Sequence, residues 1–231
     1  MPSLTTLVAA RGPVLLIDSS SASVAVAVFR PGAAPVWRQS AGEAGVAVFE
    51  NAAAALAEAG IAVRGVGAFV FCEGPGSILG IRTAAMALRT WQAAGARPSP
   101  AFAYRSLELL AADLRAAGSP PPFAVVADAR RDRWHWVEVT EAGGPGELQR
   151  LGADAVAAYR GALHLPAGFR VWSPPPPVAR SVPYEPAGLW ARQAGAELLR
   201  PAAEPDAFLH EAAVYAAWTP RIHRAPRRQA S

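Results

Sequence analysis

Residues 72–82, with the sequence CEGPGSILGIR, constrain the fold of this chain more than any other stretch. The apolar residues 66–71 before it predict a buried strand, and the long apolar segment Ile78–Ala94 after it predicts a helix. Glycines let the backbone turn sharply between them, and Ser77 is placed to cap the helix. Because helix N-termini attract anions, a phosphate-binding turn and a plain strand-to-helix connection both remain open. The turn matches neither G-x-x-x-x-G-K-[ST] nor G-x-G-x-x-G.

The composition indicates a folded protein of one large domain or two small ones. The chain has 231 residues, of which 52% are apolar and 17% charged, and all 22 basic residues are arginines. Lysine is therefore excluded from any catalytic role. Four arginines at residues 221–231 account for the net charge of +4, so a broad basic face is not expected on the body of the protein. We interpret this tail as a disordered, solubilising end, with contact to phosphate as the alternative.

The single cysteine and the apolar runs bear on the compartment. Cys72 ends a predicted buried strand, so we expect a small core residue in a reducing environment and no disulfide framework. The apolar run at residues 14–17 is too short for a signal-peptide core, and no run approaches the about 20 residues of a membrane span. We therefore expect a cytoplasmic protein with no membrane partner.

The expected secondary structure has two similar halves. Each half opens with a buried strand that ends on an aspartate, Asp18 or Asp128, followed by a hairpin-linked strand. Residues 1–13 are predicted to be a loose lead-in, Ser106 to cap a helix at 107–117, and residues 173–186 to form a rigid proline-rich loop. Further elements are expected at the following residues: strands 14–17, 23–30, 35–40, 101–103, 123–127 and 134–140, and helices 43–59, 154–160, 188–200 and 207–217.

Two of these helices are unusually apolar. Residues 43–59 place one set of apolar side chains on one face: Val46, Phe49, Ala53 and Leu56. The helix Ile78–Ala94 has one apolar stripe of Ile78, Ile81, Ala85 and Leu88 and a second of Ala84, Ala87 and Trp91. Such a helix must be covered on more than one side. The cover is either a partner protein or the core of the chain itself.

Few side chains carry a recognisable chemistry. The four histidines, 135, 164, 210 and 223, have no close spacing of a metal-binding pair, so no metal site is expected. Asp18 and Asp128 end strands where carboxylates handle Mg²⁺-phosphate, or simply where strands meet solvent. Arg82 could bind phosphate or, as we favour, brace a carboxylate such as Glu73. The strand pair Trp134 and Trp136 indicates core or partner contact. No catalytic residue is assigned.

Four motifs in order resemble a known family. Residues 17–20 (IDSS) are similar to its I-D-T-S, residues 74–82 (GPGSILGIR) to its G-P-G-S-F-T-G-L-R, residues 106–108 to S-L-E, and residues 128–130 to D-A-R. The family is that of the bacterial tRNA threonylcarbamoyladenosine biosynthesis protein TsaB (YeaZ), also labelled peptidase M22-like or glycoprotease-like. The chain departs from it at Ile78 and Leu79, which replace Phe and Thr, and at residues 131–133, which replace a glycine-containing turn.

The resemblance implies an actin-like, RNase H-like α/β fold with two lobes, which we place at residues 1–103 and 104–231. It implies a non-catalytic scaffold in forming N6-threonylcarbamoyladenosine at position 37 of tRNA. Its partners would be the catalytic, metal-holding paralogue TsaD, then TsaE with ATP, and tRNA indirectly; a homodimer would form when TsaD is absent. The interface with TsaD would comprise Val46, Phe49, Ala53, Leu56, Ile78, Ile81, Arg82, Ala85 and Leu88.

The alternative is a small actin-fold ATPase or phosphotransferase. In that case ATP or ADP would bind at Asp18, Gly74, Gly76 and Ser77. As a scaffold, the chain would require no cofactor of its own.

Overall fold

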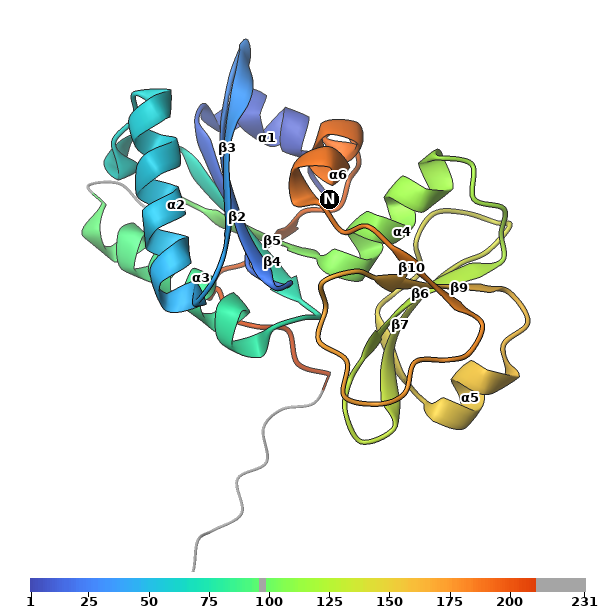
Figure 1. The fold of residues 1–231 in the computed structure, drawn as a ribbon. Helices are drawn as coiled ribbons and strands as arrows, with labels where there is room; N and C mark the ends of the chain where they lie inside the picture. Colours follow the sequence, from blue (N-terminus) through green and yellow to red (C-terminus); the bar gives the residue numbers. More distant parts are fainter. Residues whose placement is uncertain (96–98, 211–231) are drawn as a thin grey trace, which may run out of the picture.

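The computed structural model describes residues 1–95 and 99–210 and places them in two α/β lobes side by side (Figure 1). The first lobe is built on a six-stranded mixed sheet with the order β11-β5-β4-β1-β2-β3, and the second on a five-stranded mixed sheet with the order β10-β9-β6-β7-β8. The strands are β1 (Val14–Asp18), β2 (Ser23–Arg30), β3 (Ala33–Ala41), β4 (Ala68–Gly74), β5 (Ala101–Arg105), β6 (Phe123–Asp128), β7 (Arg133–Val139), β8 (Gln149–Gly152), β9 (Ala162–Pro166), β10 (Ala179–Val182) and β11 (Arg200–Pro201).

The two sheets share one topology. In each, three consecutive strands form an antiparallel meander (β1-β2-β3 and β6-β7-β8). The next strand pairs in parallel with the first strand of the meander, and the strand after it pairs in parallel with that one. The repeat expected from the two aspartate-ended strands is therefore confirmed in the topology. The expected division after residue 103 does not separate the sheets, because β5 runs to Arg105 and β11 returns to the first sheet.

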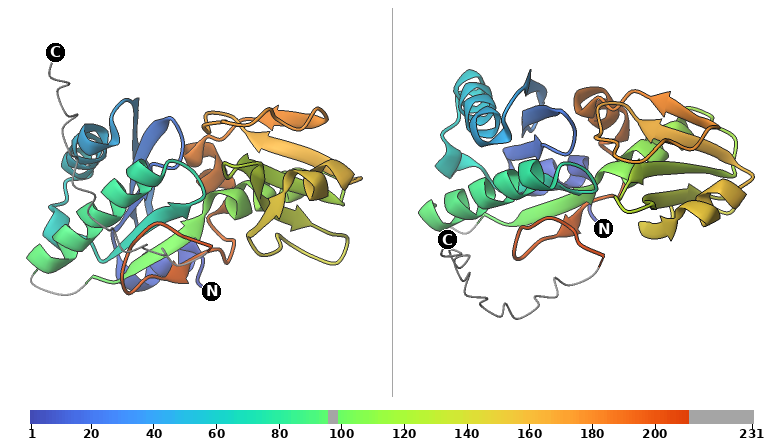
Figure 2. Two further views of the ribbon diagram at one scale, coloured as in Figure 1. Left: turned by 90° about the horizontal axis from the view of Figure 1, so that it is seen from below. Right: turned by 60° about the horizontal axis from the view of Figure 1, so that its bottom comes forward.

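The helices cover the sheets in layers. They are α1 (Leu4–Arg11), α2 (Ala44–Ala59), α3 (Ile78–Ala94), α4 (Ser106–Ala116), α5 (Ala153–Ala158) and α6 (Pro186–Gln193), with a short 3₁₀ turn η1 (Val63–Gly65). Helices α2 and α3 cover the outer face of the first sheet, α4 and α6 lie toward the second lobe, and α5 lies on the far side of the second sheet (Figure 1). Figure 2 shows the same order from two other directions.

The core of the first lobe is built around fully buried strands. In β1 every residue from Val14 to Ile17 has 0% exposure. Alternate side chains face opposite ways, so Leu15 and Ile17 pack with α2 and α3 while Val14 and Leu16 pack with the cluster that reaches the second lobe. A continuous apolar run is the pattern of a strand buried on both faces. Trp134 and Trp136 are also buried, in the cluster on the outer side of the second sheet, which confirms the core interpretation.

Helix α1 replaces the loose lead-in expected at residues 1–13. Ser3 and Thr6 cap it reciprocally, with the Thr6 N–H donating to Ser3 Oγ at 3.1 Å and the Ser3 N–H donating to Thr6 Oγ1 at 3.0 Å. Leu4 and Leu7 are buried against the rest of the chain. The helix has only eight residues, so its stability depends on that burial.

Four other expectations also need correction. The α4 helix begins at Ser106 itself, which is not its cap: its Oγ donates to the Pro75 carbonyl at 2.6 Å. The proline-rich loop contains β10, and the strand β9 before it was not expected. The helix expected at residues 188–200 is shorter and earlier, at Pro186–Gln193, while residues 207–210 are not helical. The rest of the helix expected at 207–217, and the arginine tail, lie outside the described residues.

No helix in the described part of the chain combines the length and the apolar composition needed to cross a membrane.

Candidate functional site

The Gly-Pro-Gly-Ser corner lies directly against the loop after β1. Gly76 has φ +154°, and a Cβ atom there would lie 2.2 Å from the Ser20 carbonyl oxygen. The Ser77 N–H donates to that same oxygen at 2.7 Å. Ser77 Oγ accepts from the Gly80 N–H at 3.4 Å, so the expected helix cap is confirmed. The close approach explains why glycine is needed at position 76: the chain's own backbone packs into the corner.

Asp18 is held by four donors from three parts of the chain. Its side chain accepts from the N–H and the hydroxyl of Ser20 at 2.9 and 2.6 Å, and from the phenols of Tyr104 and Tyr184 at 2.5 and 2.7 Å. The residue is 1% exposed. Burial, and then the charge of Asp18, raise the pKa of both phenols well above the ordinary value, so they remain donors. Asp18 therefore lies in the core near the Gly74–Ser77 corner, and both of its carboxylate oxygens accept hydrogen bonds from within the chain.

Arg82 and Glu73 do not pair. Glu73 Oε1 instead accepts from Arg105 Nε at 2.8 Å, and Arg82 lies 3.5 Å from Asp206 on the surface. Arg82 therefore lies beside a carboxylate as expected, but the carboxylate is that of Asp206, and Glu73 is held by Arg105 instead.

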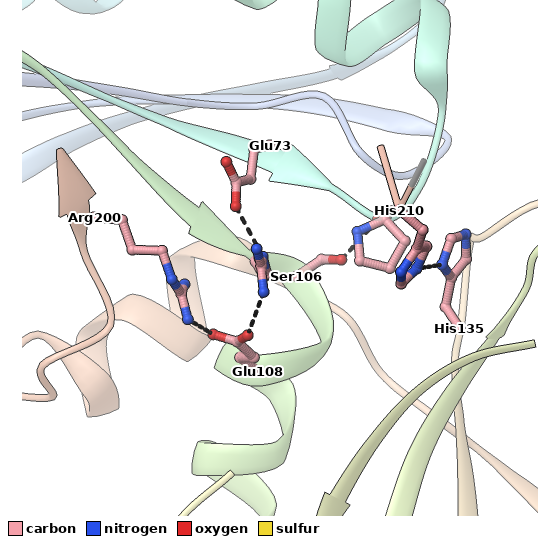
Figure 3. A network of polar contacts seen from close by, with 8 residues as sticks. Glu73, Ser106, Glu108, His135, Arg200 and His210 are labelled. Carbon is pink, nitrogen blue, oxygen red and sulfur yellow. Dashed lines mark hydrogen bonds and ion pairs between the residues drawn. The ribbon is translucent and has the colours of Figure 1, made fainter. Parts of the chain in front are cut away.

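A charged network centred on Arg105 links β4, β5, α4 and β11, and Figure 3 shows three of its members, Glu73, Glu108 and Arg200. Arg105 also contacts Glu108 Oε1 at 3.3 Å, and Arg200 Nη2 donates to Glu108 Oε2 at 2.5 Å. The Arg105 guanidinium lies 4.0 Å from the centre of the Phe208 ring. Because these groups belong to β5, α4, β11 and the segment after it, the network fixes the returning C-terminal segment to the first lobe.

The segment after β11 also reaches the second lobe. His210 Nε2 and His135 Nδ1 of β7 are 3.0 Å apart, and their rings are stacked (Figure 3). Burial, followed by the charges of His210 and Arg150, lowers the pKa of His135 to about 4. The two residues are 75 positions apart, so sequence spacing could not reveal this pair. Within the described residues, no group of three metal-binding side chains is arranged to hold an ion.

Asp128 joins two loops of the second lobe. It is 6% exposed, and its carboxylate accepts from the backbone N–H groups of Arg130 at 2.6 Å, Trp172 at 2.8 Å and Ser173 at 2.5 Å. Although burial acts to raise its pKa, these N–H groups, with Ser173 first, lower the pKa below its ordinary value. Asp128 thus remains a carboxylate that positions the loops around it.

The two apolar helices expose large side chains. On α2, Val46 is 52% and Phe49 46% exposed; on α3, Ile78 is 44%, Leu79 73% and Met86 55% exposed. We call these five residues the α2–α3 surface. Phe49 makes an edge-to-face contact with Trp91 of α3 at 6.1 Å between ring centres, which ties the two helices together.

The nine residues expected at a partner interface divide by exposure. Val46, Phe49, Ala53, Ile78 and Arg82 are exposed. The other four, Leu56, Ile81, Ala85 and Leu88, are at most 8% exposed and lie in the core of the first lobe. In this structure a partner cannot contact them. Ile81, Ala85 and Leu88 lie on the buried side of α3, while Leu79 and Met86, which were not expected, face outward.

Comparisons with known proteins bear on the family and the fold. The model of the family described as "TsaD: tRNA N6-adenosine threonylcarbamoyltransferase" matches residues 46–173. The chain is similar in structure to YeaZ from Pseudomonas aeruginosa, with a TM-score of 0.57, 23% identity, and coverage of 81% of this chain and 98% of that chain.

A second solved structure, described as an uncharacterized protein with similarity to peptidase YeaZ from Pseudomonas aeruginosa, gives a TM-score of 0.58 and 22% identity, covering 81% of this chain and 97% of that one. No curated protein matches the sequence. At these identities the likeness shows the fold, and the expected actin-like, RNase H-like architecture of two mixed-sheet lobes is confirmed.

Proposed function

The chain belongs to the tRNA N6-adenosine threonylcarbamoyltransferase (TsaD) family, and from this premise we propose that it is the TsaB-type, non-catalytic scaffold that binds TsaD. In this role it supports the formation of N6-threonylcarbamoyladenosine at position 37 of tRNA. TsaE would join the pair with ATP, and tRNA would be the substrate of the whole complex.

The exposed α2–α3 surface is the single observation that carries this proposal. Ten large apolar residues are strongly exposed in the described part of the chain, and five of them lie on these two helices. Exposed apolar side chains that gather on one surface mark sites of protein interaction. A helix pair of this kind can be covered by a second helix pair, which gives a four-helix bundle. A paralogue with the same fold would supply that pair.

The Gly-Pro-Gly-Ser corner supports the same role. Because the corner is fixed against Ser20 and Ser77 caps α3, the first residues of the helix have a defined position. Ile78 and Leu79 are the most N-terminal of the exposed apolar residues of α3. In this role the corner orients the apolar contact residues Ile78 and Leu79 and does not bind a phosphate.

The environment of Asp18 favours a scaffold over a phosphotransferase. A carboxylate that handles Mg²⁺-phosphate needs oxygens that can reach the ion and solvent. Both oxygens of Asp18 accept internal hydrogen bonds, and the residue is 1% exposed. Binding of ATP through Asp18 would require Tyr104 and Tyr184 to withdraw.

Titration calorimetry with TsaD from the same organism tests the proposal. We expect a one-to-one complex for the natural chain and a loss of at least about 30-fold in affinity for Leu79→Asp, because a carboxylate would be buried at the centre of the interface. Val178→Asp is the matched control: Val178 is 71% exposed but lies on the second lobe. Equal affinities for both variants, or no binding by the natural chain, would overturn the proposal.

The state of the isolated chain gives a second test of the same surface. We expect light scattering to show a homodimer without TsaD, since two copies can cover each other's α2–α3 surface. Leu79→Asp should then yield a monomer and Val178→Asp a dimer. Addition of TsaD should convert the homodimer to the heterodimer.

A further inference from the structure

The β6–β7 turn has an unusual backbone. Arg130, Arg131 and Asp132 have φ values of 62°, 54° and 55°, so three consecutive residues that are not glycine lie in the left-handed region. Two hydrogen bonds hold the turn: the Ala129 N–H donates to the Arg133 carbonyl at 2.9 Å, and the Arg130 N–H donates to the Asp128 carboxylate. Residues other than glycine adopt this region rarely, and such outliers cluster at active sites and ligand-binding sites. Two of the three residues here are arginines, and both are exposed.

A tryptophan from another loop completes this surface. Trp172 is 46% exposed, and the Arg130 guanidinium carbon lies 4.3 Å from the centre of its ring. The backbone N–H groups of Trp172 and Ser173 donate to the same Asp128 carboxylate that holds the turn. A buried carboxylate therefore places an exposed indole beside an exposed arginine. We call Arg130, Arg131 and Trp172 the Arg–Trp platform.

The platform adjoins a small cavity. The cavity has a volume of about 220 Å³, and Asp128, Arg170 and Val171 are among the residues that line it. This is below the usual range of about 300–1,000 Å³ for drug-sized ligands, so it suits a single ring system such as a nucleobase. Arg170 and Val171 immediately precede Trp172, so the cavity wall and the platform belong to one loop.

The charges around the platform are predominantly positive. Arg130, Arg131 and Arg133 are exposed on the turn, and Arg170 is exposed beside the cavity. The exposed acids of the same region are Asp132, on the turn, and Asp154, in the α5 helix, whose first residue donates its N–H to the Asp132 carbonyl. The region therefore has four exposed arginines and two exposed carboxylates. The buried carboxylate of Asp128 accepts hydrogen bonds from three backbone N–H groups.

We propose that the Arg–Trp platform binds single-stranded RNA, with arginines on its phosphates and an unstacked base on the indole or the guanidinium plane. Single-stranded RNA is recognised by stacking on aromatic and arginine side chains within a positive surface. An acidic protein would use the arginines but would leave the exposed indole of Trp172 without a stacking partner. That the RNA is tRNA rests on the proposed function; the platform itself lies on the second lobe, apart from the α2–α3 surface.

Fluorescence anisotropy of the full chain with a labelled tRNA anticodon stem–loop tests this inference. We expect Trp172→Ala to weaken binding about 5- to 100-fold, the effect of removing one stacked base. The double variant Arg130→Gly/Arg131→Gly should weaken binding at least about tenfold and reduce the slope of log K against log salt by about 1.4. Glycine accepts positive φ, so this variant keeps the turn, and circular dichroism verifies the fold.

Arg64→Ala/Arg115→Ala is the matched control, because it removes the same charge at exposed positions of the other parts of the chain. It should change the affinity less than about twofold. Equal losses in both double variants would show nonspecific attraction and overturn the proposal. So would displacement of the RNA by polyglutamate at equal concentration, which would identify an acidic protein as the occupant.

The failure of this proposal can be told apart from failure of the proposed function. The anisotropy measurement uses the chain without TsaD, and the platform variants should bind TsaD with unchanged affinity. Loss of TsaD binding in Leu79→Asp with normal RNA binding would confirm that the two surfaces are independent. A platform variant that lost TsaD binding as strongly as RNA binding would overturn the separate RNA site.

Discussion

The substitution Gly76→Ala tests the packing of the Gly-Pro-Gly-Ser corner. The new Cβ atom would lie 2.2 Å from the Ser20 carbonyl oxygen and 2.8 Å from its carbonyl carbon. Ser20 cannot easily withdraw, because its N–H and hydroxyl both donate to the buried carboxylate of Asp18. The corner must therefore move away and lose the bond from the Ser77 N–H to Ser20.

The magnitude follows from two contributions. Alanine at a φ of +154° costs about 1–3 kcal/mol, and the lost hydrogen bond costs about 1 kcal/mol. We therefore expect the free energy of unfolding to fall by about 3 kcal/mol. With a urea dependence of about 1–3 kcal/mol per M, the midpoint should fall by at least about 1 M.

Gly32→Ala is the matched control for the backbone contribution. Gly32 also has positive φ, +69°, but no atom lies within 4 Å of the position that the alanine methyl group would take there. Gly32→Ala should lower the free energy of unfolding by about 1 kcal/mol, the cost of the left-handed conformation alone. Urea unfolding followed by circular dichroism measures both variants. Equal losses at the two positions would refute the argument that the corner is fixed by close packing against Ser20.

Three further predictions concern stability at other sites. Tyr104→Phe removes one phenol donor from Asp18 and should cost about 2 kcal/mol in urea unfolding, as for a hydrogen bond to a charged group. Arg131→Gly, at φ 54°, should raise stability by about 0.5–1 kcal/mol, whereas the same change at Arg133 within β7 should lower it. For His135, whose pKa is lowered to about 4, the unfolded chain binds a proton below pH 6.5 that the folded chain does not, so stability should fall as pH drops from 6.5 toward 4. His135→Gln should flatten this slope by up to about 1.4 kcal/mol per pH unit, and an unchanged slope would contradict the burial of a neutral imidazole.

The candidate site was only partly predictable. The glycines of the corner and the cap at Ser77 could be predicted, because turn and cap chemistry acts over a few residues. The exposed side of α3 could not be predicted. Because apolar residues lie all around the helix, periodicity does not decide which stripe packs against the sheet. The packing of β4 and α2 buries Ile81 and Leu88 and leaves Leu79 and Met86 outside.

Local chemistry in the sequence by itself determined the strand β2 and the helix α3, whose bounds match the prediction, and the aspartates that end β1 and β6. Apolar runs, caps and breakers act within one element, so they can be read without knowing the fold. Only the tertiary structure decided the partners of those aspartates: Tyr184 is 166 residues from Asp18, and Ser173 is 45 from Asp128. It also decided the pairing of β11 with the first sheet and the contact of His135 with His210. Such contacts form when the folded backbone brings distant segments together, and no local pattern encodes them.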